Sequence, residues 1–422
     1  MIEFKYMSNA SHAHLTAHTP DTVYSWWRLV ISLMMSTIGG VGMWSVVVIL
    51  PTIETEFNIS RGDASLPYMA TMIGFAVGGV FMGRLADKSG VFIPLFMSAI
   101  IMGSGYILAA HTTNLWQFIT VQAICIGMLG SSASFAPLVA DITHWFVKRR
   151  GVAIALVASG NYLSGTIWPP LLTYGIEQYG WRISYMAVGV FCICSMTPLA
   201  FLLRQRPNLE LQAGQHDGHS DRFRLKISPR NLQAILVVAG IACCVAMSMP
   251  QVHIVAYCAD LGYGVARGAE MLSLMLGFGI ISRLVSGMIG DKIGGVGTLI
   301  IGSILQFIAL LIYIPFDGLA SLYMVSAFFG LAQGGIVPSY ALIVREYMPA
   351  KEAGARVSLV LMATVVGMAL GGWLSGFIFD LTGSYQAAFI NGMVWNLLNM
   401  SIAFWLLIGQ VKSRRRPNII QN

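Results

Sequence analysis

Charged side chains are scarce in this chain. Of its 422 residues only 10% are Asp, Glu, Lys or Arg, whereas a soluble domain carries about 25% charged residues. Hydrophobic side chains make up 56% of the sequence, which also excludes an intrinsically disordered chain. These proportions indicate a polytopic membrane protein rather than a water-soluble enzyme, because every spanning helix needs about 20 apolar residues.

The sequence also lacks the patterns of other protein classes. Its six cysteines form no Cys-x-x-Cys pair and no Cys/His cluster, so we expect no metal site and no disulfide framework. The first 25 residues hold no apolar core, so no cleaved signal peptide is expected. No catalytic constellation is visible, and we predict neither an enzyme nor a cofactor. We attribute the net charge of +7 to membrane topology, not to nucleic-acid binding.

Long apolar runs dominate what is present. Each is long enough to cross a hydrocarbon core of about 30 Å as a helix, and none alternates with the period of two expected for membrane strands. We therefore predict an all-α membrane protein with twelve transmembrane helices. The twelve runs are 26–50, 66–85, 91–110, 115–140, 151–176, 183–203, 231–257, 270–289, 296–314, 319–344, 354–379 and 385–408.

One long hydrophilic segment, 204–230, divides the runs into two groups of six. Lys and Arg are concentrated in the loops on one side of the arrangement, and only Arg61, Arg182 and Arg267 fall in loops on the other side. The positive-inside rule then places both termini in the cytoplasm, for a protein of the cell (inner) membrane. The expected parts are an N-terminal segment 1–25, a six-helix bundle 26–203, a cytoplasmic linker 204–230, a second six-helix bundle 231–408 and a basic tail 409–422.

A short motif occurs once in each half. It follows the second run as Gly83-x-x-x-Asp87-Lys88-x-Gly90 and the eighth run as Gly287-x-x-x-Asp291-Lys292-x-Gly294. The offset is 204 for every matched pair, so the second half repeats the first. Glycine permits close helix approach, and an acidic group is stabilised at a helix N-terminus. We interpret each copy as a conformational latch; the alternative is a solvated loop that only sets topology.

Twelve helices, a central hydrophilic segment and the twofold motif resemble the major facilitator superfamily over nearly the whole chain. The segments 145–153 and 250–262, and an arginine in the eighth helix, are similar to monocarboxylate transporters and their oxalate–formate antiporter relatives. The resemblance implies two bundles around a central site that opens alternately to either side of the membrane. It also implies a small carboxylate as substrate. The acidic-Gly-Gly signature of the animal transporters is absent from the first helix, which leaves the exact substrate and its coupling open.

The arginine in question, Arg283, is the strongest single candidate. It lies eight residues before Asp291, which places it about 12 Å into its helix. An arginine at this depth is costly and usually faces a cavity, where its planar guanidinium can bind a carboxylate with two hydrogen bonds. The alternative is a structural pair with a carboxylate on another helix, for which Asp141 is the only acidic candidate inside a span.

Weaker polar candidates accompany it. His253 and Tyr257 lie one turn apart in the seventh helix; a histidine titrates near neutral pH, which suits proton coupling, although a structural hydrogen bond is the alternative. Four further polar residues are candidates for substrate binding, although each can instead form a hydrogen bond between helices. The further candidates for substrate binding are Asn161, Tyr162, Gln333 and Tyr340.

The sequence therefore predicts a secondary active transporter. We expect it to move a small monocarboxylate, similar to lactate or pyruvate, together with a proton, as a monomer in the lipid bilayer. The alternatives are an organic-anion exchanger of the oxalate/formate type without proton coupling, a drug exporter, and a membrane sensor that binds its ligand without moving it. A single intramembrane cation favours a monoanion, and no acidic residue is placed to favour a cationic drug.

Overall fold

The computed structural model describes residues 21–147, 149–205, 228–348 and 350–414, and within them it contains helices and no strand. The first half consists of α2 (Val23–Gly39), α3 (Val41–Phe57), α4 (Arg61–Ser89), α5 (Phe92–Ala110), α6 (Leu115–Val121), a π-helical segment η1 (Gln122–Met128), a 3₁₀ turn η2 (Ser131–Ser134), α7 (Ala136–Ile142), α8 (Arg150–Tyr179) and α9 (Trp181–Leu202). The second half consists of α10 (Pro229–Asp260), α11 (Val265–Tyr313), α12 (Leu319–Gln333), α13 (Ile336–Tyr347), α14 (Ala350–Thr382) and α15 (Tyr385–Arg414).

These helices account for the twelve predicted passes. Ten helical segments of the described chain are long and apolar enough to cross a membrane. The longest of them, α11, contains two passes, because its helical backbone is interrupted at Gly294. Helix α8 supplies the remaining pass; it is not among the ten segments, and its middle carries Ser159, Asn161 and Ser164. The fold is therefore all-α with twelve transmembrane helices in two bundles of six.

The helices are longer than the apolar runs that predicted them. The first pass extends over 23–57, with a break at Gly40 between α2 and α3. The last helix continues to Arg414, beyond the expected start of the tail at 409. The expected linker falls between the end of α9 and the start of α10, and most of it, like most of the segments 1–25 and 409–422, lies outside the described residues.

The internal repeat extends to the backbone. Gly90 (φ 80°, ψ 167°) and Gly294 (φ 82°, ψ 171°) end the motif in each half with the same left-handed conformation, which glycine adopts without strain. The fourth pass of each half is also broken at matched positions, at Gly130 between η1 and η2 and at Gly334 between α12 and α13. An offset of 204 relates both pairs, so the two halves share a common architecture.

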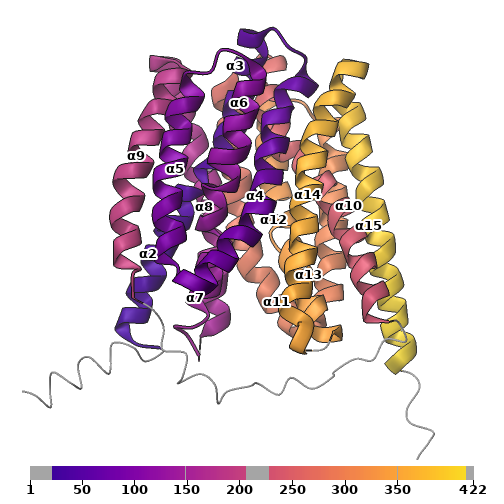
Figure 1. Ribbon diagram of the computed structural model, residues 1–422. Coiled ribbons are helices and arrows are strands. Elements are labelled where there is room, and N and C mark those ends of the chain that lie inside the picture. Colours follow the sequence, from indigo (N-terminus) through magenta and orange to yellow (C-terminus); the bar gives the residue numbers. More distant parts are fainter. Residues whose placement is uncertain (1–20, 148, 206–227, 349, 415–422) are drawn as a thin grey trace, which may run out of the picture.

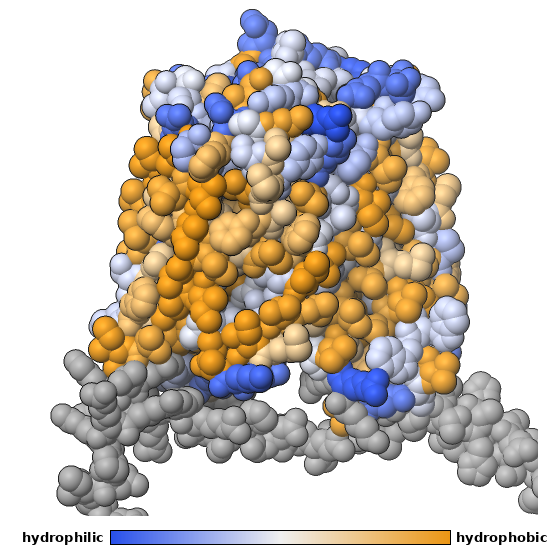
Figure 2. Space-filling model, turned by 180° about the vertical axis from the view of Figure 1, so that it is seen from behind, coloured by the Kyte–Doolittle hydropathy of each residue, from blue (hydrophilic) through white to orange (hydrophobic). Residues whose placement is uncertain are grey.

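The two halves stand side by side and meet through two helix pairs. Helix α4 packs against α14, and α8 packs against α11 (Figure 1). The start of α2 and the end of α15 lie at one end of the molecule, which we call the terminal face. The turns between α3 and α4 and between α14 and α15 lie at the other end, the opposite face. Figure 2 shows a broad apolar surface between these ends, with hydrophilic residues gathered near both of them.

Candidate functional site

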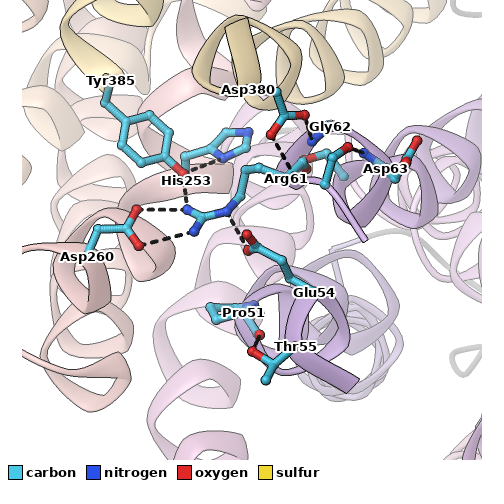
Figure 3. Close-up of polar contacts among 12 residues, drawn as sticks. Pro51, Glu54, Thr55, Arg61, Gly62, Asp63, His253, Asp260, Asp380 and Tyr385 are labelled. Carbon is cyan, nitrogen blue, oxygen red and sulfur yellow. Dashed lines mark hydrogen bonds and ion pairs between the residues drawn. The ribbon is translucent and has the colours of Figure 1, made fainter. Parts of the chain in front are cut away.

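At the opposite face, Arg61 at the start of α4 holds the two halves together (Figure 3). Its Nε donates to Glu54 on α3 at 2.5 Å, within the same half. Its Nη1 and Nη2 donate to the carboxylate of Asp260 on α10 at 2.9 and 3.1 Å, and Nη1 also donates to the hydroxyl of Tyr385 on α15 at 2.6 Å. Arg61 is 6% exposed, whereas the side chain of Asp260 is 35% exposed, so only the arginine end of this ion pair is shielded from water.

The backbone at the start of α4 is bound as well. The amides of Arg61 and Gly62 donate to the two carboxylate oxygens of Asp380 on α14, at 2.9 and 2.7 Å. A helix N-terminus favours a negative charge, so a carboxylate of the second half completes a helix of the first. A Cβ at position 62 would lie 2.9 Å from the Asp380 side chain and 3.3 Å from the backbone of Phe377, so only glycine allows this approach. We call Glu54, Arg61, Asp260, Asp380 and Tyr385 the gate cluster.

The terminal face has a different arrangement. The described hydrogen bonds between the halves lie at the opposite face or in the middle of α8 and α11, where Ser273 donates to the carbonyl of Thr166 and Arg283 to that of Ala158. Nearer the terminal face, a Cβ added at Gly83 of α4 or at Gly287 of α11 meets no described atom within 4 Å. The halves are thus hydrogen-bonded at the opposite face and in the middle of α8 and α11, and their helices diverge toward the terminal face (Figure 1).

Arg283 lies in the middle of this arrangement, on α11 where it meets α8. Its Nη1 donates to the carbonyl of Ala158 at 2.7 Å, and its guanidinium carbon lies 4.3 Å from the ring centroid of Tyr162. Its Nε is buried without a hydrogen-bond partner. Within the described part of the chain, no carboxylate forms an ion pair with it.

The predicted structural alternative for Arg283 does not occur here, because Asp141 has another partner. Arg28 of α2 binds both carboxylate oxygens of Asp141, with Nε at 2.7 Å and Nη2 at 2.9 Å. Arg28 also donates to the carbonyl of Leu203 and lies over the ring of Trp145. Both charged groups are buried, at 1% and 8% exposure, so this pair is compensated inside the first half.

His253 and Tyr257 lie on α10 near the gate cluster. His253 is fully buried; its Nδ1 lies 3.1 Å from the hydroxyl of Tyr385, and its Nε2 lies 2.7 Å from the carbonyl oxygen of Gly372 on α14. Tyr257 is half-buried and packs edge-on against the rings of Tyr385 and Phe389. Neither residue is in hydrogen-bond contact with Arg283 among the described contacts.

The other predicted site residues fall into two groups. Tyr162 faces Arg283 directly, and Asn161 next to it accepts a hydrogen bond from the indole of Trp44 at 3.2 Å. Gln333 and Tyr340, in contrast, are fully buried within the second half. Gln333 accepts a hydrogen bond from Gln251 at 2.5 Å, and the hydroxyl of Tyr340 donates to Asn399 at 2.7 Å.

The motif residues lie at the terminal face. Asp87, Lys88, Asp291 and Lys292 are exposed, and among the described contacts none of them forms an ion pair. No three His, Cys, Asp or Glu side chains of the described residues are grouped so that they could hold a metal ion.

Sequence reasoning missed the gate cluster. The charge pattern places Arg61 in a loop on the outer side, and its partners Asp260 and Asp380 lie 199 and 319 residues further along the chain. The available signal was the charge itself: Arg61 is one of only three basic residues on that side, beside an acidic Glu54.

Comparisons with known proteins agree with this architecture. Monocarboxylate transporter 13 of Bos taurus is 25% identical over 394 residues, which cover 89% of this chain and 87% of the relative. The MFS-type transporter pynF of Aspergillus niger is 22% identical over 321 residues, covering 75% of this chain and 72% of its own. The solved structure of a bacterial homolog of the human lysosomal transporter Spinster, inward-facing and unoccupied, superimposes with a TM-score of 0.71 at 13% identity and covers 94% of this chain and 100% of that one.

The decisive match is to a whole family. The sequence profile of the Major Facilitator Superfamily matches residues 32–355 and 296–421. The chain belongs to the Major Facilitator Superfamily. Members of this superfamily are membrane carriers and not enzymes, so the chain is a multi-pass transporter of a small molecule in a lipid bilayer. The hydrogen-bonded opposite face and the helices that diverge toward the terminal face fit one of the alternating states of a major facilitator carrier.

Proposed function

We propose that this transporter moves a small monocarboxylate, similar to lactate or pyruvate, together with a proton. The observation that supports the proposal most directly is Arg283, a guanidinium in the middle of a membrane helix with a buried, unpartnered Nε and no carboxylate in the described contacts. An unpaired charge at this depth is costly, by several kcal/mol on most scales, so a bound anion is the natural partner. The single cation matches a monoanion better than a dianion.

The surroundings of Arg283 suit a small organic acid. The ring of Tyr162 covers one face of the guanidinium and fixes its plane, while the unpartnered Nε is free to join a two-bond contact with a carboxylate. Asn161 and Trp44 lie beside this point and can contact the body of the substrate. We place Gln333 and Tyr340 behind this site, because both are fully buried in the second half, where Gln333 accepts from Gln251 and Tyr340 donates to Asn399.

For the proton we propose His253. It is a histidine inside a membrane helix, and its hydrogen bond to Tyr385 connects it to Arg61 of the other half. A group that changes charge near neutral pH and touches the contact between the halves can link proton binding to alternating access. The similarity to monocarboxylate transporter 13 supports this class of substrate, at 25% identity.

The motif loops belong to the same cycle. We place both termini in the cytoplasm, and on that assignment the structure would be the inward-open state, in which Asp87 and Asp291 are exposed. We propose that they engage neighbouring helix ends as latches when the terminal face closes, which would stabilise the outward-open state. We take the monomer as the transporting unit.

The test is uptake of labelled lactate into proteoliposomes, with and without an inward proton gradient. The variants are wild type, Arg283→Gln, and Arg345→Gln as a matched control, since Arg345 is an exposed arginine at the end of α13. We expect gradient-driven uptake that Arg283→Gln abolishes and Arg345→Gln retains. Uptake unchanged in Arg283→Gln would remove Arg283 as the anchor. Lactate uptake that requires internal anion but no proton gradient would indicate an organic-anion exchanger instead.

A further inference from the structure

The hydrogen bonds around His253 form a chain whose direction is fixed at both ends. A guanidinium only donates and a backbone carbonyl only accepts. Nη1 of Arg61 donates to the oxygen of Tyr385 at 2.6 Å, so the hydroxyl proton of Tyr385 is directed to Nδ1 of His253 at 3.1 Å. Nε2 of His253 then carries the proton that is donated to the carbonyl of Gly372 at 2.7 Å. Every group is satisfied, and the imidazole in this chain is neutral.

A second proton on His253 conflicts with this arrangement. Nδ1 would become a donor and point at the oxygen of Tyr385, which already accepts from Arg61. The hydroxyl proton of Tyr385 would lose its acceptor in a place where His253 is fully buried, and an unpaired buried donor is destabilising. The imidazolium would also lie only one hydroxyl group away from the guanidinium, and like charges at this distance repel.

The carboxylates nearby do not relieve this conflict. Glu54 from α3 and Asp260 from α10 bind the guanidinium, and Asp380 from α14 binds the first amides of α4. Among the described hydrogen bonds none of the three contacts His253. Two tyrosines also lie nearby among the described residues: Tyr257 on α10 packs its ring against Tyr385, and the ring of Tyr68 on α4 lies beside Gly372.

We propose that His253 is the pH-dependent switch of the gate cluster: the closed gate holds a neutral imidazole, and protonation of His253 from water at the opposite face favours the open gate. The switch rests on the proposed role of His253 in proton coupling and deepens it, and it holds whichever solute is carried. Binding linkage is reciprocal, so a gate that closes only on neutral His253 must lose closed population as the pH falls. A histidine in water titrates near pH 6.5, which gives an increase of about tenfold in the open-to-closed ratio between about pH 7.5 and about pH 5.5.

The experiment measures the gate directly and without substrate. Thr55 on α3 and Gln386 on α15 are exposed residues of opposite halves at this face. They are replaced by cysteine and spin-labelled in full-length protein in nanodiscs, with all six native cysteines replaced by alanine so that only the two new sites react. Double electron–electron resonance then gives the populations of short and long distances at both pH values. In the test variant, His253→Gln, the amide can donate and accept but does not titrate. The control is His111→Gln, an exposed histidine at the end of α5.

On acidification, we expect the ratio of long-distance to short-distance populations to rise about tenfold in wild type and in His111→Gln. In His253→Gln the same ratio should change less than about twofold. His253→Asn, whose amide likewise does not titrate, should abolish the response in the same way and decides the question if His253→Gln does not fold. A response that persists in a folded His253→Gln or His253→Asn protein would overturn the proposal and assign the switch to the carboxylates of the gate cluster. A wild-type gate that ignores pH would overturn it as well. Because no lactate is present, neither result depends on the identity of the substrate.

Discussion

Two arginines of this carrier have opposite surroundings, so replacing each by glutamine should separate folding from transport. Arg28→Gln leaves the carboxylate of Asp141, which is 8% exposed, without the two bonds of 2.7 and 2.9 Å that it receives from Arg28. Breaking a buried ion pair from one side costs about 3–5 kcal/mol, because the remaining charge stays buried and unpaired. We expect the free energy of unfolding to fall by about this amount.

Arg283→Gln removes a charge that has no described carboxylate partner. It loses one hydrogen bond to the carbonyl of Ala158 and the contact with the ring of Tyr162, the latter worth about 0.5–2 kcal/mol. It also removes a buried, unpartnered Nε and an uncompensated charge, which are unfavourable by a similar amount. We expect stability within about 1 kcal/mol of wild type, together with a loss of transport.

Stability is measured by thermal unfolding of the purified protein in detergent, followed by the fluorescence of its ten tryptophans. Transport is measured by uptake into proteoliposomes. Adding Asp141→Asn to Arg28→Gln removes the stranded charge and should recover part of the loss, by a coupling of about 0.5–3 kcal/mol. If Arg283→Gln unfolded as readily as Arg28→Gln while Arg345→Gln did not, Arg283 would be a structural residue and the reasoning would be refuted.

Three further substitutions test the contacts described above. Gly62→Val places a side chain against Asp380, so we expect it to open the opposite face and shift the conformational ratio roughly 5–150-fold, measurable from the spin-label distances. Tyr162→Leu removes the aromatic face under Arg283 and should raise the lactate concentration at half-maximal uptake roughly 2–30-fold, whereas Tyr162→Phe should change it less than about twofold. Asp87→Asn should leave thermal unfolding unchanged, because the carboxylate is exposed. It should slow lactate exchange if Asp87 forms the latch when the terminal face closes. Equal exchange rates in wild type and Asp87→Asn would mean that the motif loop only sets topology.

The helices and their repetition could be predicted because they depend on local patterns. Apolar runs of helical length define the passes, and the matched glycines predicted a loop that the structure repeats at Gly90 and Gly294 with nearly identical dihedral angles. The interruptions at Gly130 and Gly334 were not predicted, because a short break inside an apolar run changes neither its length nor its composition.

The pairing of charges could not be predicted, because it depends on how distant helices pack. Arg28 stands near the start of the first apolar run, which holds no acidic residue, yet it lies buried against a carboxylate 113 residues away. Asp141 is the only acidic candidate inside a span, which makes it the candidate partner for Arg283. The sequence alone gives no means of choosing between Arg28 and Arg283 as its partner. The depth of Arg283 in its helix, in contrast, follows from the number of residues between it and Asp291, so the sequence predicts it as a candidate site residue.

The two halves share their backbone plan but not their charges. The position of Arg61 is taken in the second half by Val265, and that of Arg283 is taken in the first half by Gly79. A symmetric scaffold thus carries an asymmetric set of ionic groups: a salt-bridged barrier at one mouth of the pathway and solvated loops at the other. Influx and efflux through such a carrier are not kinetic mirror images. Right-side-out and inside-out vesicles should therefore differ in half-saturating concentration and in pH dependence, even where the overall equilibrium is the same.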